Sequence, residues 1–71
     1  MNPICDRLRE AATLGGEHDI ELSLDSLGVV VRRRWVLRTW TRRVDYLDIA
    51  EARYNVLRQA VEEAIQIGES V

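Results

Sequence analysis

The sequence predicts a two-layer α+β domain with the element order α-β-β-β-α, in which both helices cover one face of a three-stranded antiparallel meander. Helical spacing of apolar residues over 3–14 and 48–67 predicts the two helices. Strict alternation over 18–24 and a β-branched, arginine-rich run over 28–44 predict the strands. The 71 residues are expected to form one small domain, 1–71, whose core is close to the minimum for independent folding.

The first helix is predicted over residues 3–14. Asn2 is expected to cap it, and Pro3 suits the first helical position because its missing N–H would be unpaired there in any case. Gly15 and Gly16 follow the last apolar position of the pattern. Because glycine readily takes left-handed backbone, these two residues are expected to end the helix.

The first hairpin has a register that two independent patterns support. Residues 18–24 form the strand, and Asp25-Ser26-Leu27-Gly28 is typical of a turn in which Gly takes positive φ. Pairing Leu24 with Val29 aligns apolar residues on one face and opposite charges on the other. The remaining pairs are Leu22–Val31, Ile20–Arg33, Glu21–Arg32 and Asp19–Arg34.

The second connection is less clearly marked, because no Gly or Pro interrupts residues 28–44. A tight turn at Leu37-Arg38 would lead into a strand over 39–45 and place Trp35 opposite Trp40. The same register gives the pairs Arg33–Arg42, Val31–Val44 and Val29–Tyr46. The alternative is one long bent strand whose end projects as an arm, although strands usually span about 3–10 residues.

The last helix is predicted over residues 48–67. Asp48 and Glu51 have the spacing of a capping box with Asp in the place of Ser or Thr. Apolar residues continue at three- and four-residue intervals, and Gly68 is expected to end the helix.

Composition excludes several classes of function. With one cysteine, Cys5, the chain cannot form an internal disulfide, and with one histidine, His18, we expect no four-ligand zinc site. Phosphate loops, nucleophile elbows and metal motifs are absent from the sequence, so we expect no enzyme activity, no cofactor and no metal.

The first residues do not follow the signal-peptide pattern, and no run approaches the roughly 20 apolar residues of a membrane span. We therefore expect a cytoplasmic protein without membrane contact. Small size and the absence of lysine are typical of an accessory protein of a GC-rich bacterium or its phage.

The charges are segregated along the chain. Residues 28–44 hold six of the ten arginines, both tryptophans and no acid, whereas the remainder carries a net charge of −8. In the predicted register several of these residues lie on the sheet face that the helices leave uncovered. The candidate partner-binding residues are Arg32, Arg34, Val36, Arg38, Thr41 and Arg43.

The favoured interpretation is a non-enzymatic protein-binding module, acting as an adaptor, inhibitor or regulator. Arginine and aromatic residues are enriched at the centres of protein interfaces. The strand over 39–45 would be an open sheet edge, and such an edge readily pairs with a second copy of itself. We therefore expect a protein partner and a homodimer.

The alternative interpretation is a nucleic-acid-binding protein that contacts phosphates through the ribbon from Arg32 to Arg43. The element order resembles the double-stranded-RNA-binding domain in topology. That family opens its last helix with lysines directed at phosphates, whereas this chain has Asp48, Ile49, Ala50 and Glu51 at the matching place. A third interpretation is that the arginines only pair with the acids of this chain, which would contribute little each.

Overall fold

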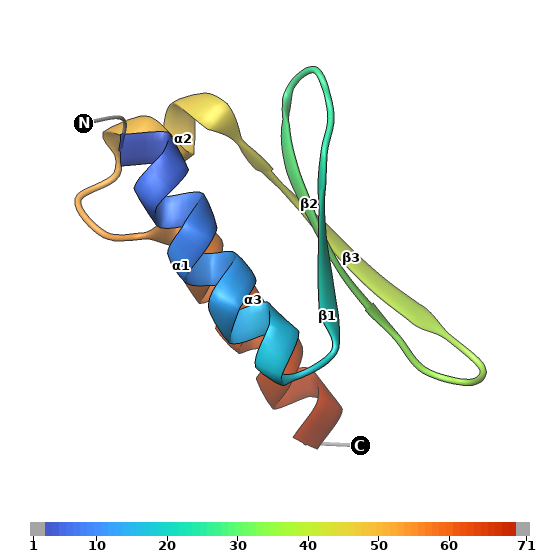
Figure 1. Cartoon of the computed structure of the whole chain (residues 1–71). Helices are drawn as coiled ribbons and strands as arrows, with labels where there is room; N and C mark the ends of the chain where they lie inside the picture. Colours follow the sequence, from blue (N-terminus) through green and yellow to red (C-terminus); the bar gives the residue numbers. More distant parts are fainter. Residues whose placement is uncertain (1–2, 70–71) are drawn as a thin grey trace.

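The computed structural model describes residues 3–69 and has the predicted α+β architecture (Figure 1). Its three strands form one antiparallel sheet in the order β1-β2-β3, and α1 and α3 pack together on one face of that sheet. The elements are α1 (Pro3–Glu17), β1 (Ile20–Leu24), β2 (Gly28–Arg34), β3 (Thr39–Asp45), α2 (Tyr46–Glu51) and α3 (Val56–Glu69). The short helix α2 is an element that the sequence analysis did not separate.

The core lies between the sheet and the two long helices. Alternate strand residues point into it because side chains alternate between the faces of a strand. The helix α3 contributes a stripe at intervals of three and four residues, which is the buried face of an amphipathic helix. The buried hydrophobic residues are Ala11, Ile20, Val29, Val31, Val44, Ile49, Leu57, Ala60, Val61 and Ala64.

The helix α1 extends beyond its predicted end and continues through both glycines to Glu17. No glycine within residues 3–69 has positive φ; the left-handed residue that leads into β1 is Asp19, with φ 57°. Gly15 serves a different purpose, because a Cβ atom there would lie 3.0 Å from the carbonyl oxygen of Ile20. Its missing side chain therefore permits close helix–strand packing. The predicted cap Asn2 lies outside the described residues.

The predicted register of the first hairpin is confirmed from Leu24–Val29 to Ile20–Arg33. The observed strand begins at Ile20, two residues later than predicted, so Asp19 does not pair with β2. Glu21 lies opposite Arg32 as predicted, but its ion pair is with Arg34, at 3.9 Å. The backbone register was therefore correct, whereas the predicted ion pairs were not.

The second hairpin also consists of two strands, but its predicted register is wrong by two residues. Val29 pairs with Val44 and Arg33 with Trp40, so the predicted Trp35–Trp40 pair does not form. The loop is centred on residues 36–37, one position earlier than predicted, and Trp35 N–H donates to the carbonyl of Arg38 at 2.8 Å. A shift of two residues leaves every side chain on its predicted face. It moves Val44 from the predicted position opposite Val31 to a position opposite Val29.

The predicted helix 48–67 is two helices, because residues 52–55 interrupt it between α2 and α3. The capping box of Asp48 and Glu51 does not form, since α2 already begins at Tyr46. The cap of α3 is Asn55 instead. Its side-chain oxygen accepts hydrogen bonds from the backbone N–H groups of Leu57 and Arg58, at 3.1 and 3.2 Å.

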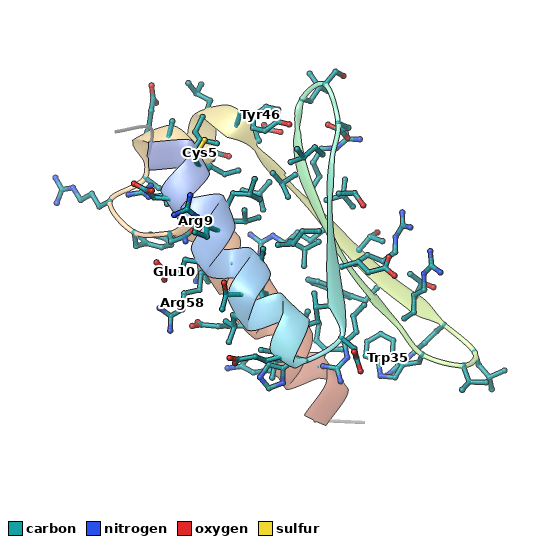
Figure 2. All side chains as sticks on the ribbon, in the orientation of Figure 1. Cys5, Arg9, Glu10, Trp35, Tyr46 and Arg58 are labelled. Atoms are coloured by element: carbon teal, nitrogen blue, oxygen red, sulfur yellow. The ribbon has the colours of Figure 1, made fainter. Side chains whose placement is uncertain are left out.

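Asn55 also fastens α1 to the rest of the molecule. Its side-chain N–H donates to the carbonyl of Arg7 at 2.9 Å, while the guanidinium of Arg7 donates to the carbonyl of Ile49 at 2.6 Å. Farther along the helix pair, the guanidinium of Arg58 meets the carboxylate of Glu10 at 2.7 Å (Figure 2). The break between α2 and α3 therefore has a structural role in docking α1.

Replacing Asn55 with Ala is expected to lower the free energy of unfolding by about 1–2 kcal/mol, because α3 loses its N-cap and the Arg7 carbonyl loses its donor. Asn55→Ser is the matched control, since Ser keeps a capping oxygen and lacks the N–H donor. Urea denaturation followed by circular dichroism would check both. Equal destabilisation by the two variants would contradict a capping role.

Candidate functional site

The structure separates the six predicted partner-binding residues into two groups. Arg32, Arg34, Thr41 and Arg43 lie on the outer sheet face, which is the face turned away from α1 and α3. Val36 and Arg38 lie instead in the β2–β3 loop. Val36 was predicted to continue the outer strand face, and the shorter strand places it at the hairpin tip. We define the hairpin tip as residues 35–38.

Two of the outer-face arginines are paired with acids of the first hairpin. Arg34 lies 3.9 Å from the carboxylate of Glu21, and Arg43 lies 2.7 Å from that of Asp25. All four side chains are partly exposed, so these pairs contribute little to stability. Within the described part of the chain Arg32 has no ion pair. The outer face is therefore a mixed-charge surface.

Asp25 is fixed by its own turn. Its carboxylate accepts the backbone N–H groups of Leu27 and Gly28, at 2.8 and 2.9 Å. These two hydrogen bonds are the main reason why the pKa of Asp25 is lowered. Desolvation opposes them, and the charge and hydrogen bond of Arg43 add smaller lowering effects. The carboxylate thereby orients Arg43 on the outer face.

This shift predicts a dependence of stability on pH. A carboxylate whose pKa is lower in the folded state stabilises the fold above its unfolded pKa, and the contribution is lost as pH falls through the folded pKa. Asp25→Asn should therefore destabilise the protein at about pH 7 and have a smaller effect at about pH 2, because the carboxylate takes up a proton as pH falls. Urea denaturation at both values checks this. An equal effect at both values would exclude the ionised carboxylate as the stabilising group.

The hairpin tip exposes two adjacent large apolar side chains. Val36 and Leu37 are 99% and 95% exposed. Just beneath them Trp35 is only partly exposed, and the guanidinium carbons of Arg38 and Arg33 lie 4.7 and 5.4 Å from its ring centroid. Figure 2 shows Trp35 where the hairpin enters its loop. Cation–π contacts of this geometry stabilise the position of Trp35, directly before the exposed Val36 and Leu37.

The inner-face arginines fasten the hairpin to α3. Arg33 donates to the carbonyl of Ala64 at 2.9 Å. Arg42 forms an ion pair with Glu63. In the predicted register these two arginines lay opposite each other. Their observed partners were not predictable because they come from a helix that is distant in sequence. These two arginines hold the hairpin in place.

The edge of β3 is open. In an antiparallel pair every second residue of a strand hydrogen-bonds through its backbone to the neighbouring strand. The Trp35–Arg38 hydrogen bond fixes which residues these are, so the backbone groups of Trp40 and of every second residue after it bond to β2. The backbone N–H and C=O groups of Thr39, Thr41 and Arg43 therefore point away from β2. No other strand within residues 3–69 pairs with this edge.

A groove of about 500 Å³ runs beside the same edge, between β3 and the α2–α3 connection. The residues that line it include an apolar and an aromatic side chain, two acids and two bases: Val44, Tyr54, Asp48, Glu51, Arg42 and Arg43. Neither acid forms an ion pair with the described residues. The groove was not predicted from the sequence, because its wall is formed by the break in a segment, 48–67, that was predicted to be one helix. Asn55, a strong capping residue inside that pattern, was the signal for the break.

Comparisons with protein-family models, with curated proteins and with solved structures find no match to this chain. Among the described helices, none combines the length and the apolar character that crossing a membrane requires. In residues 3–69, acids, cysteine and histidine form no cluster of three with the spacing of a metal site.

Proposed function

We propose that this protein is a non-enzymatic protein-binding module that acts through the outer sheet face, the β3 edge and the hairpin tip. The observation that carries the proposal is the pair of exposed apolar side chains at Val36 and Leu37. Apolar side chains gathered on an exposed, well-supported segment are typical of binding sites. Arginines around them match the composition of protein interfaces, in which Arg and aromatic residues are enriched.

The pairing of the arginines favours a protein partner over nucleic acid. Binding to phosphates needs cations that are free to replace counterions. Arg34, Arg42 and Arg43 already have carboxylate partners, and Glu21 lies on the same face as Arg34. A partner that offers both apolar and charged groups fits this mixed surface better than a polyanion.

Site-specific cross-linking would test the proposal. A photoreactive amino acid at position 36 is expected to give discrete protein adducts in cells, whereas the same group at Ala12, on an exposed part of α1, gives few. The double variant Val36→Ser/Leu37→Ser should then weaken binding to the purified, identified partner by about tenfold or more, because both apolar anchors are lost. Equal adduct formation at both positions would contradict the proposal.

A titration with DNA and RNA distinguishes protein binding from the alternative function, nucleic-acid binding. Binding through Arg32, Arg34, Arg38 and Arg43 would weaken steeply as salt rises, with a slope set by the number of phosphates contacted. We expect no such binding at low salt. Tight, salt-sensitive binding that is lost in Arg32→Ala and Arg38→Ala variants would replace the protein-binding proposal with the nucleic-acid one.

A further inference from the structure

The two edges of the sheet are not equivalent. The first strand, β1, is short, and α1 approaches its edge closely where Gly15 lies against the carbonyl of Ile20. The β3 edge is seven residues long and, among the described elements, no strand pairs with it. Open edges of this length are templates for strand addition. A partner strand is therefore expected to pair with β3.

We propose that this strand is β3 of a second copy, paired antiparallel about a twofold axis that passes beside Thr41. The inference rests on the proposed function and specifies its partner. Since the chain is small and its core alone supplies only about 3–5 kcal/mol, pairing of two copies would also stabilise the fold. Such an interface is isologous, so every contact occurs twice.

The charges of β3 select the register. The backbone groups of alternate residues point to the open edge, so the twofold axis must pass beside a residue and not between two residues. Moving the axis by one residue changes the pairing of the strands by two. A twofold axis beside Trp40 would place Arg42 opposite Arg38 of the second copy. An axis beside Arg42 would place that residue opposite itself, and an axis beside Arg43 would do the same for Arg43. Like charges directly opposite each other are destabilising. Of the axes that pair five or more residues of β3 with the second copy, only the one beside Thr41 avoids every such pair.

This register places complementary residues opposite one another. Thr41 faces Thr41 of the second copy, which is a favourable cross-strand pair. Trp40 faces Arg42 of the second copy on the inner face, where the guanidinium can stack on the indole ring. Thr39 faces Arg43 of the second copy. The pairing therefore joins the two sheets without burying an uncompensated charge.

The same register directs each hairpin tip to the groove of the other copy. Arg38 would lie opposite Val44 of the second copy, and Leu37 opposite its Asp45. Val44 is one wall of the groove, and Asp48 and Glu51 supply carboxylates there that lack ion pairs with the described residues. A cationic tip bearing two exposed apolar side chains would thus meet a groove in which Arg42 and Arg43 already have carboxylate partners, whereas Asp48 and Glu51 do not. Both exposed features of the monomer would be covered by one contact.

Engineered disulfides test the register directly. In a background where the exposed Cys5 is replaced by Ser, Thr41→Cys is expected to form a covalent dimer under mild oxidation. The two Cα atoms at the axis would lie about 5.5 Å apart, which is within reach of a disulfide. The control Thr39→Cys should form no covalent dimer, because its two copies would lie about 14 Å apart along the strands. A mixture of Thr39→Cys and Arg43→Cys proteins should give the mixed dimer.

Charge reversal tests the contact between tip and groove. Arg38→Glu and Glu51→Arg are each expected to raise the dimer dissociation constant about tenfold in sedimentation experiments, because the contact is made twice. The double variant, in which the charges are exchanged, should recover most of the loss. Failure of the double variant to recover, after both single variants weaken the dimer, would overturn this contact.

The outcome can be separated from that of the proposed function. A strict monomer at high micromolar concentration, with no disulfide at position 41, would overturn the homodimer even if position 36 still cross-links to another protein. In that case the protein-binding proposal would stand with a different partner. A homodimer without other adducts would support both proposals, with self-association as the binding activity. If position 41 gave no disulfide dimer and position 36 gave no cross-linked adducts, both the homodimer and the protein-binding proposal would be overturned.

Discussion

Leu57→Ala is expected to unfold a large fraction of the protein at room temperature. Leu57 is 0% exposed at the start of α3, where it belongs to the stripe that packs on the sheet. Truncating a fully buried leucine costs about 2–5 kcal/mol, through lost transfer free energy and the cavity that remains. A core of this size supplies only about 3–5 kcal/mol in total. One substitution can therefore remove most of the stability.

Leu47→Ala is the matched control, because it makes the same chemical change at a side chain that is 66% exposed. Its free energy of unfolding should lie within about 0.5 kcal/mol of the parent value. Circular dichroism during urea denaturation, at equal protein concentration for all variants, measures both. Since self-association would add to apparent stability, the concentration must be held constant. Similar losses in the two variants would contradict the assigned core.

Gly28→Ala is expected to have the second largest effect. A Cβ atom at Gly28 would lie 2.9 Å from the Cα atom of Asp45 and closer still to the carbonyl oxygen of Val44. Both neighbours are backbone atoms, so the β2–β3 pairing itself must shift to accept a methyl group. Overpacking of this kind costs about 1–3 kcal/mol and occasionally more. Thermal denaturation would report the loss.

Gly16→Ala provides the control for this substitution. A Cβ atom there would meet nothing within 4 Å, and the residue lies inside α1. Because Ala is a better helix former than Gly, the variant should gain up to about 1 kcal/mol of stability. A stabilising Gly28→Ala substitution would show that the backbone contact is less tight than the geometry indicates.

These glycines illustrate what the sequence can reveal. Gly28 was predicted as a turn residue with positive φ, but no described glycine has positive φ. Its requirement is close contact with the junction of β3 and α2, where Tyr46 also bonds to the carbonyls of Leu27 and Asp25. That contact joins residues far apart in sequence, and local patterns hold no information about it. Gly15 packs against Ile20 for the same kind of reason.

The two hairpins show when register can be predicted. In the first, apolar alternation and the turn residues Asp25 and Gly28 agree on one pairing, and that pairing is observed. In the second, alternation alone fixes which face a side chain occupies but permits shifts of two residues. The Trp35–Trp40 pair looked favourable locally, but Trp35 instead stacks with Arg33 and Arg38. Alternation therefore predicted the faces of the second hairpin and left its register open.

The candidate site was predictable only in part. The outer-face positions of Arg32, Arg34, Thr41 and Arg43 followed correctly from side-chain alternation. The location of Val36 at the tip depended on the register shift. The groove depended on the interruption at Asn55, where a local cap outweighs continuous helical periodicity. Sequence therefore predicted the faces better than it predicted the ends of the elements.

The bond between Asn55 and the carbonyl of Arg7 has a consequence for the order of folding. It spans 48 residues, as does the ion pair of Arg58 with Glu10, whereas the three strands are joined by short local connections. Local contacts form before contacts that close long loops. The meander is therefore expected to assemble first, and α1 docks only after α3 has been synthesised. The helix α1 is the first element to leave the ribosome, yet it is expected to be the last to pack against the rest of the domain.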